Sequence, residues 1–144
     1  TYEPTAGRLL AEGARRLLDS RHFPETIFDV LAVRSDALQT HPEALRALIA
    51  AHFRGIHHLR QNPQDAAYRL AARLELPGDK ALEAFHGLQL PGLAQNRRLL
   101  SADGRLQLVS QELSALMLET GLLTHADSLQ GLISGAYLPD ETAT

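Results

Sequence analysis

One apolar run, residues 27–33 with the sequence Ile-Phe-Asp-Val-Leu-Ala-Val, lacks the spacing of an amphipathic helix. A run of this kind is typical of a strand buried on both faces, as in a parallel sheet covered by helices. The chain holds no second segment of comparable pattern, and a lone strand leaves its backbone N–H and C=O groups unpaired. Either residues 27–33 are not a strand, or the other strands of the sheet lie outside these 144 residues.

Elsewhere the apolar positions recur with the spacing of helices. A first helix is predicted to follow Pro4 and to stop near Asp19, and Ser35 and Asp36 can cap a short helical turn. The sequence Thr-His-Pro-Glu at 40–43 has the form of a capping box with a proline in the first turn. It predicts the start of a long helix that carries a regular apolar stripe, made of Leu45, Leu48, Ile49, His52, Ile56 and Leu59.

That helix should end near Asn62, which can itself cap the next helix, with Pro63 at the first position. Further helices are predicted at about 81–85, 94–100, 105–119 and 127–133, and Gly121 is placed to end the third of these. The helix at 105–119 should bury one side, formed by Leu106, Val109, Leu113, Leu116 and Met117.

The composition favours a helical core, and it gives no support to several kinds of partner and chemistry. Hydrophobic residues make up 44% of the chain and aromatic residues only 5%, so the core must be built from leucine and alanine. The net charge of −3 gives no electrostatic reason to expect nucleic acid or an anionic membrane as partner. Cysteine is absent, which excludes disulfides and thiol catalysis. No segment has the roughly 18 continuous apolar residues of a membrane span, and the amino terminus lacks the basic-then-apolar pattern of a signal sequence, as a processed or truncated chain also would.

Reactive side chains do not occur at the spacings that catalysis or metal binding requires. His52, His57 and His58 include no pair at i, i+4, so no metal site is expected among them. The serines lack a glycine-flanked nucleophile elbow, and no glycine-rich phosphate loop is present. The arginine pairs at 15–16 and 97–98 are isolated and balanced by nearby acids, so they should lie on solvated faces. The sequence therefore predicts no catalytic residue and no cofactor.

The chain carries several short motifs, each present once, in a definite order. They are Asp-Val-Leu-Ala-Val-Arg-Ser-Asp at 29–36, His-Pro-Glu at 41–43, Asn-Pro at 62–63, Asn96 ahead of Leu99-Leu100, Gly-Leu-Leu at 121–123 and Tyr-Leu-Pro at 137–139, after an opening Thr-Tyr-Glu-Pro. In this order the chain resembles the carboxyl-terminal part of the nitrate, sulfonate and taurine group of periplasmic substrate-binding proteins of ABC transporters, which includes thiamine-pyrimidine binders.

The resemblance implies an α/β fold of the type II periplasmic binding proteins, represented here by a mostly helical fragment with one strand at about 27–33. Residues 1–25 would end the second lobe and approach the hinge, and residues 26–144 would supply the returning strand and the helical half of the first lobe. The parent protein would be periplasmic or lipid-anchored outside the cytoplasm. It would deliver a small solute to a membrane permease without chemistry, and the fragment could self-associate through the unpaired strand 27–33.

Four residues near the expected hinge are candidates for ligand contact. Asp29 is the first of these, because a carboxylate inside an apolar strand is costly to bury unpaired, and taurine-binding members place an acid at the matching position. Glu3 could accept hydrogen bonds from the ligand, Tyr2 could stack on it, and Thr26 could donate its hydroxyl. Structural roles compete with each: a loop cap or arginine pair for Asp29, a surface acid for Glu3, packing for Tyr2 and an intrachain hydrogen bond for Thr26.

Two other interpretations remain at this stage. The chain could be an all-helical interaction or sensor domain that shares only a pattern with the receptors. Less favoured is a relative of the enzymes that build the thiamine pyrimidine, because the motif for that chemistry does not occur in the chain.

Overall fold

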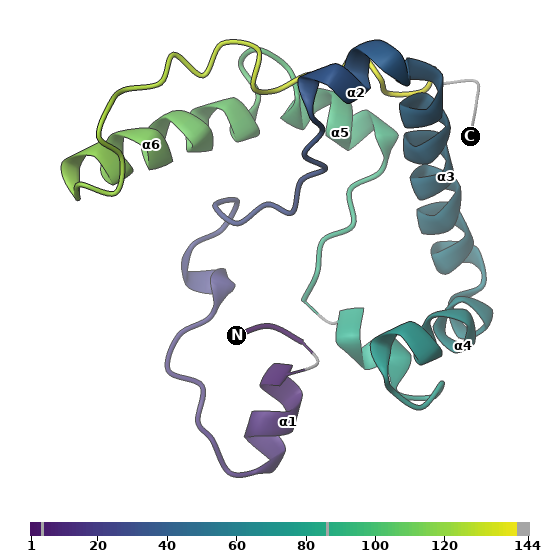
Figure 1. Cartoon of the computed structure of the whole chain (residues 1–144). Helices are drawn as coiled ribbons and strands as arrows, with labels where there is room; N and C mark the ends of the chain where they lie inside the picture. The colour runs from purple at the N-terminus through teal and green to yellow at the C-terminus, as the bar shows by residue number, and fades with distance from the viewer. Residues whose placement is uncertain (4, 86, 141–144) are drawn as a thin grey trace. The chain divides into compact units, whose positions relative to one another are not determined.

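A computed structural model describes residues 1–3, 5–85 and 87–140, and within these ranges the chain forms helices joined by turns and coil (Figure 1). No strand occurs in the described ranges. The elements in order are α1 (Thr5–Ala11), the 3₁₀ helix η1 (Ser20–His22), α2 (Ser35–Thr40), α3 (Pro42–Gln61), α4 (Pro63–Leu74), the 3₁₀ helix η2 (Ala81–Phe85), α5 (Leu93–Leu99) and α6 (Arg105–Glu119).

The predicted α/β fold of a type II binding-protein fragment is therefore wrong for this structure, which is helical. Residues 27–33 are neither strand nor helix, and three of their large apolar side chains are exposed: 71% for Ile27, 64% for Val30 and 58% for Leu31. The physical reason is the lack of partner strands in the described part of the chain. An apolar run becomes a strand only when a neighbour supplies the ladder of hydrogen bonds, and no such neighbour lies among the described residues.

The two helix starts marked by proline are confirmed, although the predicted capping bonds do not form. Helix α3 begins at Pro42 and α4 at Pro63, where a missing N–H costs nothing. Thr40 does not cap α3, because it is the last residue of α2 and its hydroxyl donates to the Asp36 carbonyl at 2.8 Å. Asn62 likewise makes no side-chain cap bond to α4. The prolines, rather than the caps, mark these boundaries.

Two predicted helices are wrong in extent or in kind. Helix α1 ends at Ala11 rather than near residue 19, because Gly13 takes a left-handed conformation with φ of +95° and terminates it. Residues 127–133 form turns rather than a helix: the Asp127 carboxylate accepts the N–H of Leu129 at 3.0 Å, a local bond that competes with helix formation. A short helical turn does follow Arg34, but Ser35 and Asp36 lie inside α2 and Arg34 takes the cap position. The helices predicted at 81–85 and 105–119 are confirmed, and the one predicted at 94–100 is present one residue earlier, as α5.

The chain divides into two compact units, each described here by itself. The first comprises residues 1–22 and 52–90, and the second comprises residues 23–51 and the described part of the chain from 91 onwards. In the first unit, α4 packs on η2, and the buried side chains come from the end of α3, from α4 and from η2: Phe53, Ile56, Ala66, Ala67, Ala81 and Ala84. The predicted boundary between residues 25 and 26 stays a prediction.

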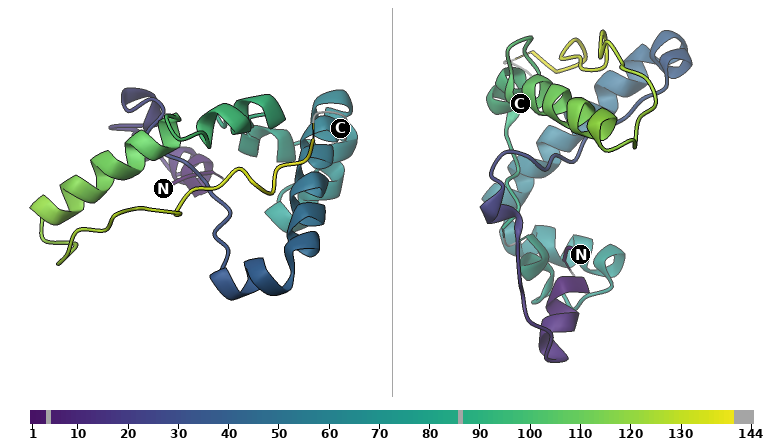
Figure 2. Two further views of the ribbon diagram at one scale, coloured as in Figure 1. Left: turned by 90° about the horizontal axis from the view of Figure 1, so that it is seen from above. Right: turned by 90° about the vertical axis from the view of Figure 1, so that its left-hand side faces the viewer.

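In the second unit, α5 packs on α6 through the turn that joins them. Gly104 closes this turn: its N–H donates to the Ser101 carbonyl at 2.9 Å, and a Cβ at this position would collide with the carbonyl oxygens of Arg98 and Leu99. After α6 the coil runs back beside that helix and past α5 to the first turns of α3 (Figures 1 and 2). The predicted apolar side of α6 is only partly buried, with Val109 enclosed and Leu113 and Leu116 about half exposed.

Candidate functional site

Tyr2 and Glu3, two of the predicted ligand contacts, lie in the first unit at the start of α1. Tyr2 is 84% exposed. The Glu3 carboxylate accepts the N–H of Gly7 at 3.0 Å, so it satisfies one of the free donors in the first turn of the helix. Glu3 therefore acts as a helix cap in this structure, and Tyr2 is available to a partner.

Thr26 and Asp29, the other two predicted contacts, belong to the coil of the second unit. The Thr26 hydroxyl donates to the Pro24 carbonyl at 3.1 Å, which is the structural alternative anticipated for it. Asp29 is exposed rather than enclosed in a strand, so the expectation of a buried, costly carboxylate does not apply. Because the two pairs belong to separate units, the structure does not gather the four residues into one site.

A basic hollow lies in the second unit at the turn between α5 and α6. It is open to solvent, has a volume of about 710 Å³ and is lined by three arginines, Arg97, Arg98 and Arg105. Two carboxylates, from Glu25 and Asp103, also line it. We refer to this feature as the basic hollow.

Hydrogen bonds, two of them between distant parts of the chain, hold the arginines of the basic hollow in place. Arg105 donates from Nε to the Glu25 carbonyl at 3.2 Å, which ties the first turn of α6 to a segment 80 positions earlier. Arg97 donates to the carbonyl of Pro139, which ties α5 to the carboxyl-terminal coil. The Ser101 hydroxyl lies 2.9 Å from both the Asp103 carboxylate and the Arg98 carbonyl, and its single proton can be donated to one of them at a time. The lining of the hollow thus comes from two segments far apart in the sequence, Glu25 and residues 95–105.

A second, smaller hollow of about 380 Å³ lies between α3 and the carboxyl-terminal coil. Arg46 forms one wall, with its guanidinium 5.2 Å from the centre of the Tyr137 ring and a hydrogen bond of 3.1 Å to the Ala136 carbonyl. These contacts fix the coil to α3. Because the Arg46 guanidinium already contacts Tyr137 and Ala136, we interpret this hollow as part of the packing between α3 and the coil.

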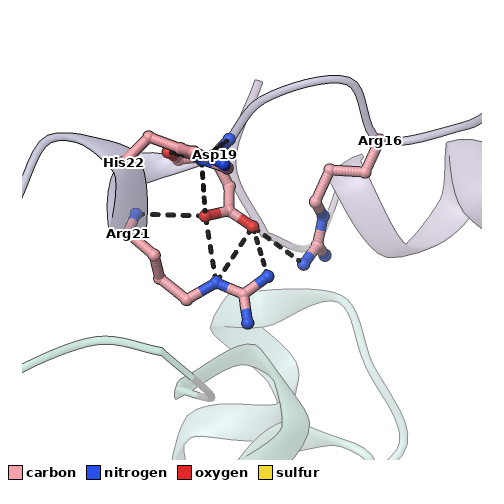
Figure 3. A network of polar contacts seen from close by, with 4 residues as sticks. All are labelled: Arg16, Asp19, Arg21 and His22. Carbon is pink, nitrogen blue, oxygen red and sulfur yellow. Dashed lines mark hydrogen bonds and ion pairs between the residues drawn. The ribbon is translucent and has the colours of Figure 1, made fainter.

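Asp19 is the centre of an ion network in the first unit (Figure 3). Arg21 binds its carboxylate through the side chain, at 2.5 Å from one guanidinium nitrogen, and through the backbone N–H, and Arg16 approaches to 3.4 Å. The hydrogen bond from the Arg21 side chain is the main reason that the pKa of the Asp19 carboxyl lies far below its usual range. The network orders the bend after α1.

A second ion network joins the end of α3 to α4. The Asp65 carboxylate lies 2.6 Å from Arg69 Nε and 2.6 Å from His58 Nε2, and the hydrogen bonds from Arg69 and then His58 lower the pKa of Asp65. No group of three or more metal-ligating side chains occurs among the described residues. No helix described here is long and apolar enough to cross a membrane.

The sequence reasoning missed the basic hollow. It assigned Arg97 and Arg98 to solvated faces, and it gave no role to Arg105. The usable signal was the turn Ser-Ala-Asp-Gly at 101–104, which reverses the chain between two helices and brings the arginines on either side of it together. Nothing in the sequence indicates that Glu25 lines the same hollow as residues 95–105.

Comparison with known proteins returned no relative: no family model matches the chain, and no curated protein or solved structure is significantly similar to it.

Proposed function

We propose that this chain is part of the substrate-binding component of an ABC importer and that it binds a small sulfonate, nitrate-like or amine-bearing solute without chemistry. The observation that carries the proposal is the coil at 27–33, where Ile27, Val30 and Leu31 stay exposed on either side of Asp29. Contiguous exposed apolar groups are often surfaces that other polypeptide covers. This supports a chain that is completed by further protein, as a receptor built from two parts would be.

The choice of a receptor rests on the ordered motifs. Two of them, His-Pro-Glu at 41–43 and Asn-Pro at 62–63, coincide with the starts of α3 and α4, and Asp29 opens a third. The resemblance implies delivery of the solute to a membrane permease outside the cytoplasm. The proposal does not depend on the α/β fold, which the structure contradicts.

Asp29 is the residue on which solute recognition depends most in this proposal. Its exposed carboxylate can accept hydrogen bonds from an ammonium or amino group of the solute. Tyr2 can add a stacking face. Glu3 and Thr26 are weaker candidates, because each already forms a hydrogen bond within the chain.

Calorimetric titration of the natural full-length protein that contains this chain tests the proposal. The titrants are taurine, nitrate and an aminopyrimidine. We expect at least one to bind, and we expect Asp29→Asn to weaken an amine-bearing solute about tenfold while leaving nitrate unchanged. Glu12→Gln, which removes another exposed acid, is the matched control. Absence of binding by all three solutes would refute the proposal, and equal loss in both variants would remove Asp29 from the site.

A helical interaction domain is the second candidate, favoured by the exposed leucines of α6. Leu108, Leu113 and Leu116 are 45%, 52% and 54% exposed. A protein partner could cover them, whereas a small solute has no need of such a surface. In this case the titrations would give no heat, and Leu113→Asp, rather than Asp29→Asn, would disrupt the complex.

A further inference from the structure

The basic hollow has the charge and the donors of an anion site. Three arginines line it against two acidic residues, and the Asp103 carboxylate lies 2.9 Å from the Ser101 hydroxyl. Guanidinium groups present paired N–H donors in a planar fork that matches the oxygens of sulfate, sulfonate and phosphate. An anion in the hollow would also meet the first turn of α6, where Gly104 offers no side-chain cap to the free N–H groups.

Independently of charge, Arg97, a residue that lines the hollow, has one buried donor without an acceptor. Arg97 Nε is the one buried side-chain nitrogen or oxygen within the described residues that has no hydrogen-bond partner. Buried donors are almost always paired, and a bound water or ion is one of the explanations for an unpaired one. Since Arg97 lines the hollow, an oxyanion is a chemically suitable acceptor.

The three arginines divide into two that are held by other groups and one that is available. Arg97 is fixed by the Pro139 carbonyl, and Arg105 by the Glu25 carbonyl and by an ion pair of 3.4 Å with the Glu112 carboxylate. Arg98 is exposed, and it forms no side-chain hydrogen bond or ion pair with the described parts of the chain. Arg98 can therefore close over a bound ion without breaking contacts that hold the fold.

We propose that the turn between α5 and α6 binds a tetrahedral oxyanion, either as a free ion or as the headgroup of a larger molecule, through Arg97, Arg98 and Arg105. The volume of about 710 Å³ leaves room for the remainder of such a molecule. Sulfonates are common to this inference and to the proposed function, but the residues are not: loss of binding in Arg98→Gln tests this site, and loss in Asp29→Asn tests the other.

The test is an NMR titration of the 144-residue chain with sodium sulfate, sodium phosphate and taurine, with sodium chloride at matched ionic strength as reference. We expect saturable shifts of the backbone amides of residues 98–105 with sulfate or phosphate and none with chloride. A response to taurine as well would identify a headgroup site, and a response to the inorganic ions alone would identify a site for the free ion. Both results support an oxyanion site.

Arg98→Gln is the diagnostic variant, because its side chain makes no contact on which folding depends. It should weaken sulfate binding about fivefold, the loss expected for one exposed charge-assisted contact. Arg54→Gln is the matched control: it removes the same charge from an exposed position on α3. Shifts that chloride reproduces, the absence of saturation, or an equal loss in both variants would overturn the proposal.

Discussion

Gly104 and Gly55 respond in opposite ways to the addition of one methyl group. A Cβ on Gly104 would collide with the backbone carbonyls of Arg98 and Leu99, which cannot move without opening the turn before α6. A Cβ on Gly55 meets no atom within 4 Å, and Gly55 lies in the interior of α3. We therefore expect Gly104→Ala to destabilise the chain by 1 kcal/mol or more and Gly55→Ala to stabilise it by about 0.5–1 kcal/mol.

Urea denaturation followed by circular dichroism at 222 nm measures both changes in the free energy of unfolding. The two variants serve as controls for each other, since the chemical change is the same. A Gly104→Ala chain as stable as the wild type would show that the turn is open rather than closed on the carbonyls.

The Asp19 network makes a prediction about pH. In the folded chain the pKa of the Asp19 carboxyl lies well below the value of about 3.9 expected for an unfolded chain. A depressed folded-state pKa means that the network stabilises the fold above about pH 4 and that this contribution is lost as the pH falls towards the folded-state pKa. Carboxyl carbon NMR should show Asp19 still ionised at about pH 3, where ordinary aspartates are mostly protonated.

Arg21→Gln should move the Asp19 titration up towards the ordinary value, because the Arg21 side chain is the main cause of the shift. Arg16→Gln removes the same charge at 3.4 Å, where its effect is the smallest of the causes, and should move the titration less. Equal shifts in the two variants would mean that the network acts through general charge rather than through the hydrogen bonds of Arg21.

At the scale of elements, the sequence was most informative where a boundary is set locally. Proline fixes the starts of α3 and α4, and the turn at 101–104 separates α5 from α6, so all four helices were predictable. The strand at 27–33 depended on partners that the sequence does not contain. Helix α1 was overextended because Gly13 fits an apolar stripe as well as it fits a helix end.

The candidate site was less predictable than the elements. The basic hollow requires Arg105 to reach the Glu25 carbonyl and Arg97 to reach the Pro139 carbonyl, across 80 and 42 positions of the chain. Helical periodicity gives the face on which a residue lies, but it says nothing of contacts at such separations. The four residues chosen from the resemblance are instead exposed or engaged in local hydrogen bonds.

The exposed coil at 27–33 should make the isolated chain associate. Ile27 and Leu31 are 71% and 58% exposed, and burying them between copies would remove apolar surface from water. We expect sedimentation velocity to show concentration-dependent association, and the double variant Ile27→Asp, Leu31→Asp to abolish it.

Leu17→Asp is the control for this prediction, because Leu17 is 90% exposed but lies outside the coil. It should leave association unchanged. A wild-type chain that stays monomeric over the whole concentration range would contradict the prediction, and the same loss in the control would place the interface elsewhere.

At the scale of the whole molecule, the buried apolar set is small for 144 residues. Within the described residues it contains eight side chains, four of them alanine, and no large side chain is fully enclosed. Because burial of apolar area is the dominant favourable term in folding, the isolated chain should be marginally stable, with a free energy of unfolding at or below about 5 kcal/mol.

Urea titration of the isolated chain at low concentration, below the onset of association, checks this expectation. The midpoint should lie at low urea and should rise when a covering partner or a bound ligand is present. A midpoint typical of a well-packed domain of this length would show that the exposed leucines do not limit stability.

The contacts of Arg46 with Ala136 and Tyr137 also affect the order in which the chain folds. This contact closes a loop of 90 positions, whereas most hydrogen bonds of the helices join residues four apart. Closing a loop of that length costs more chain entropy than closing a helical turn, and it raises the contact order. The helices should therefore form first, and the contacts of Arg46 with Ala136 and Tyr137 should form last. The carboxyl-terminal coil would then be the last part to dock during refolding and the first to come loose during unfolding.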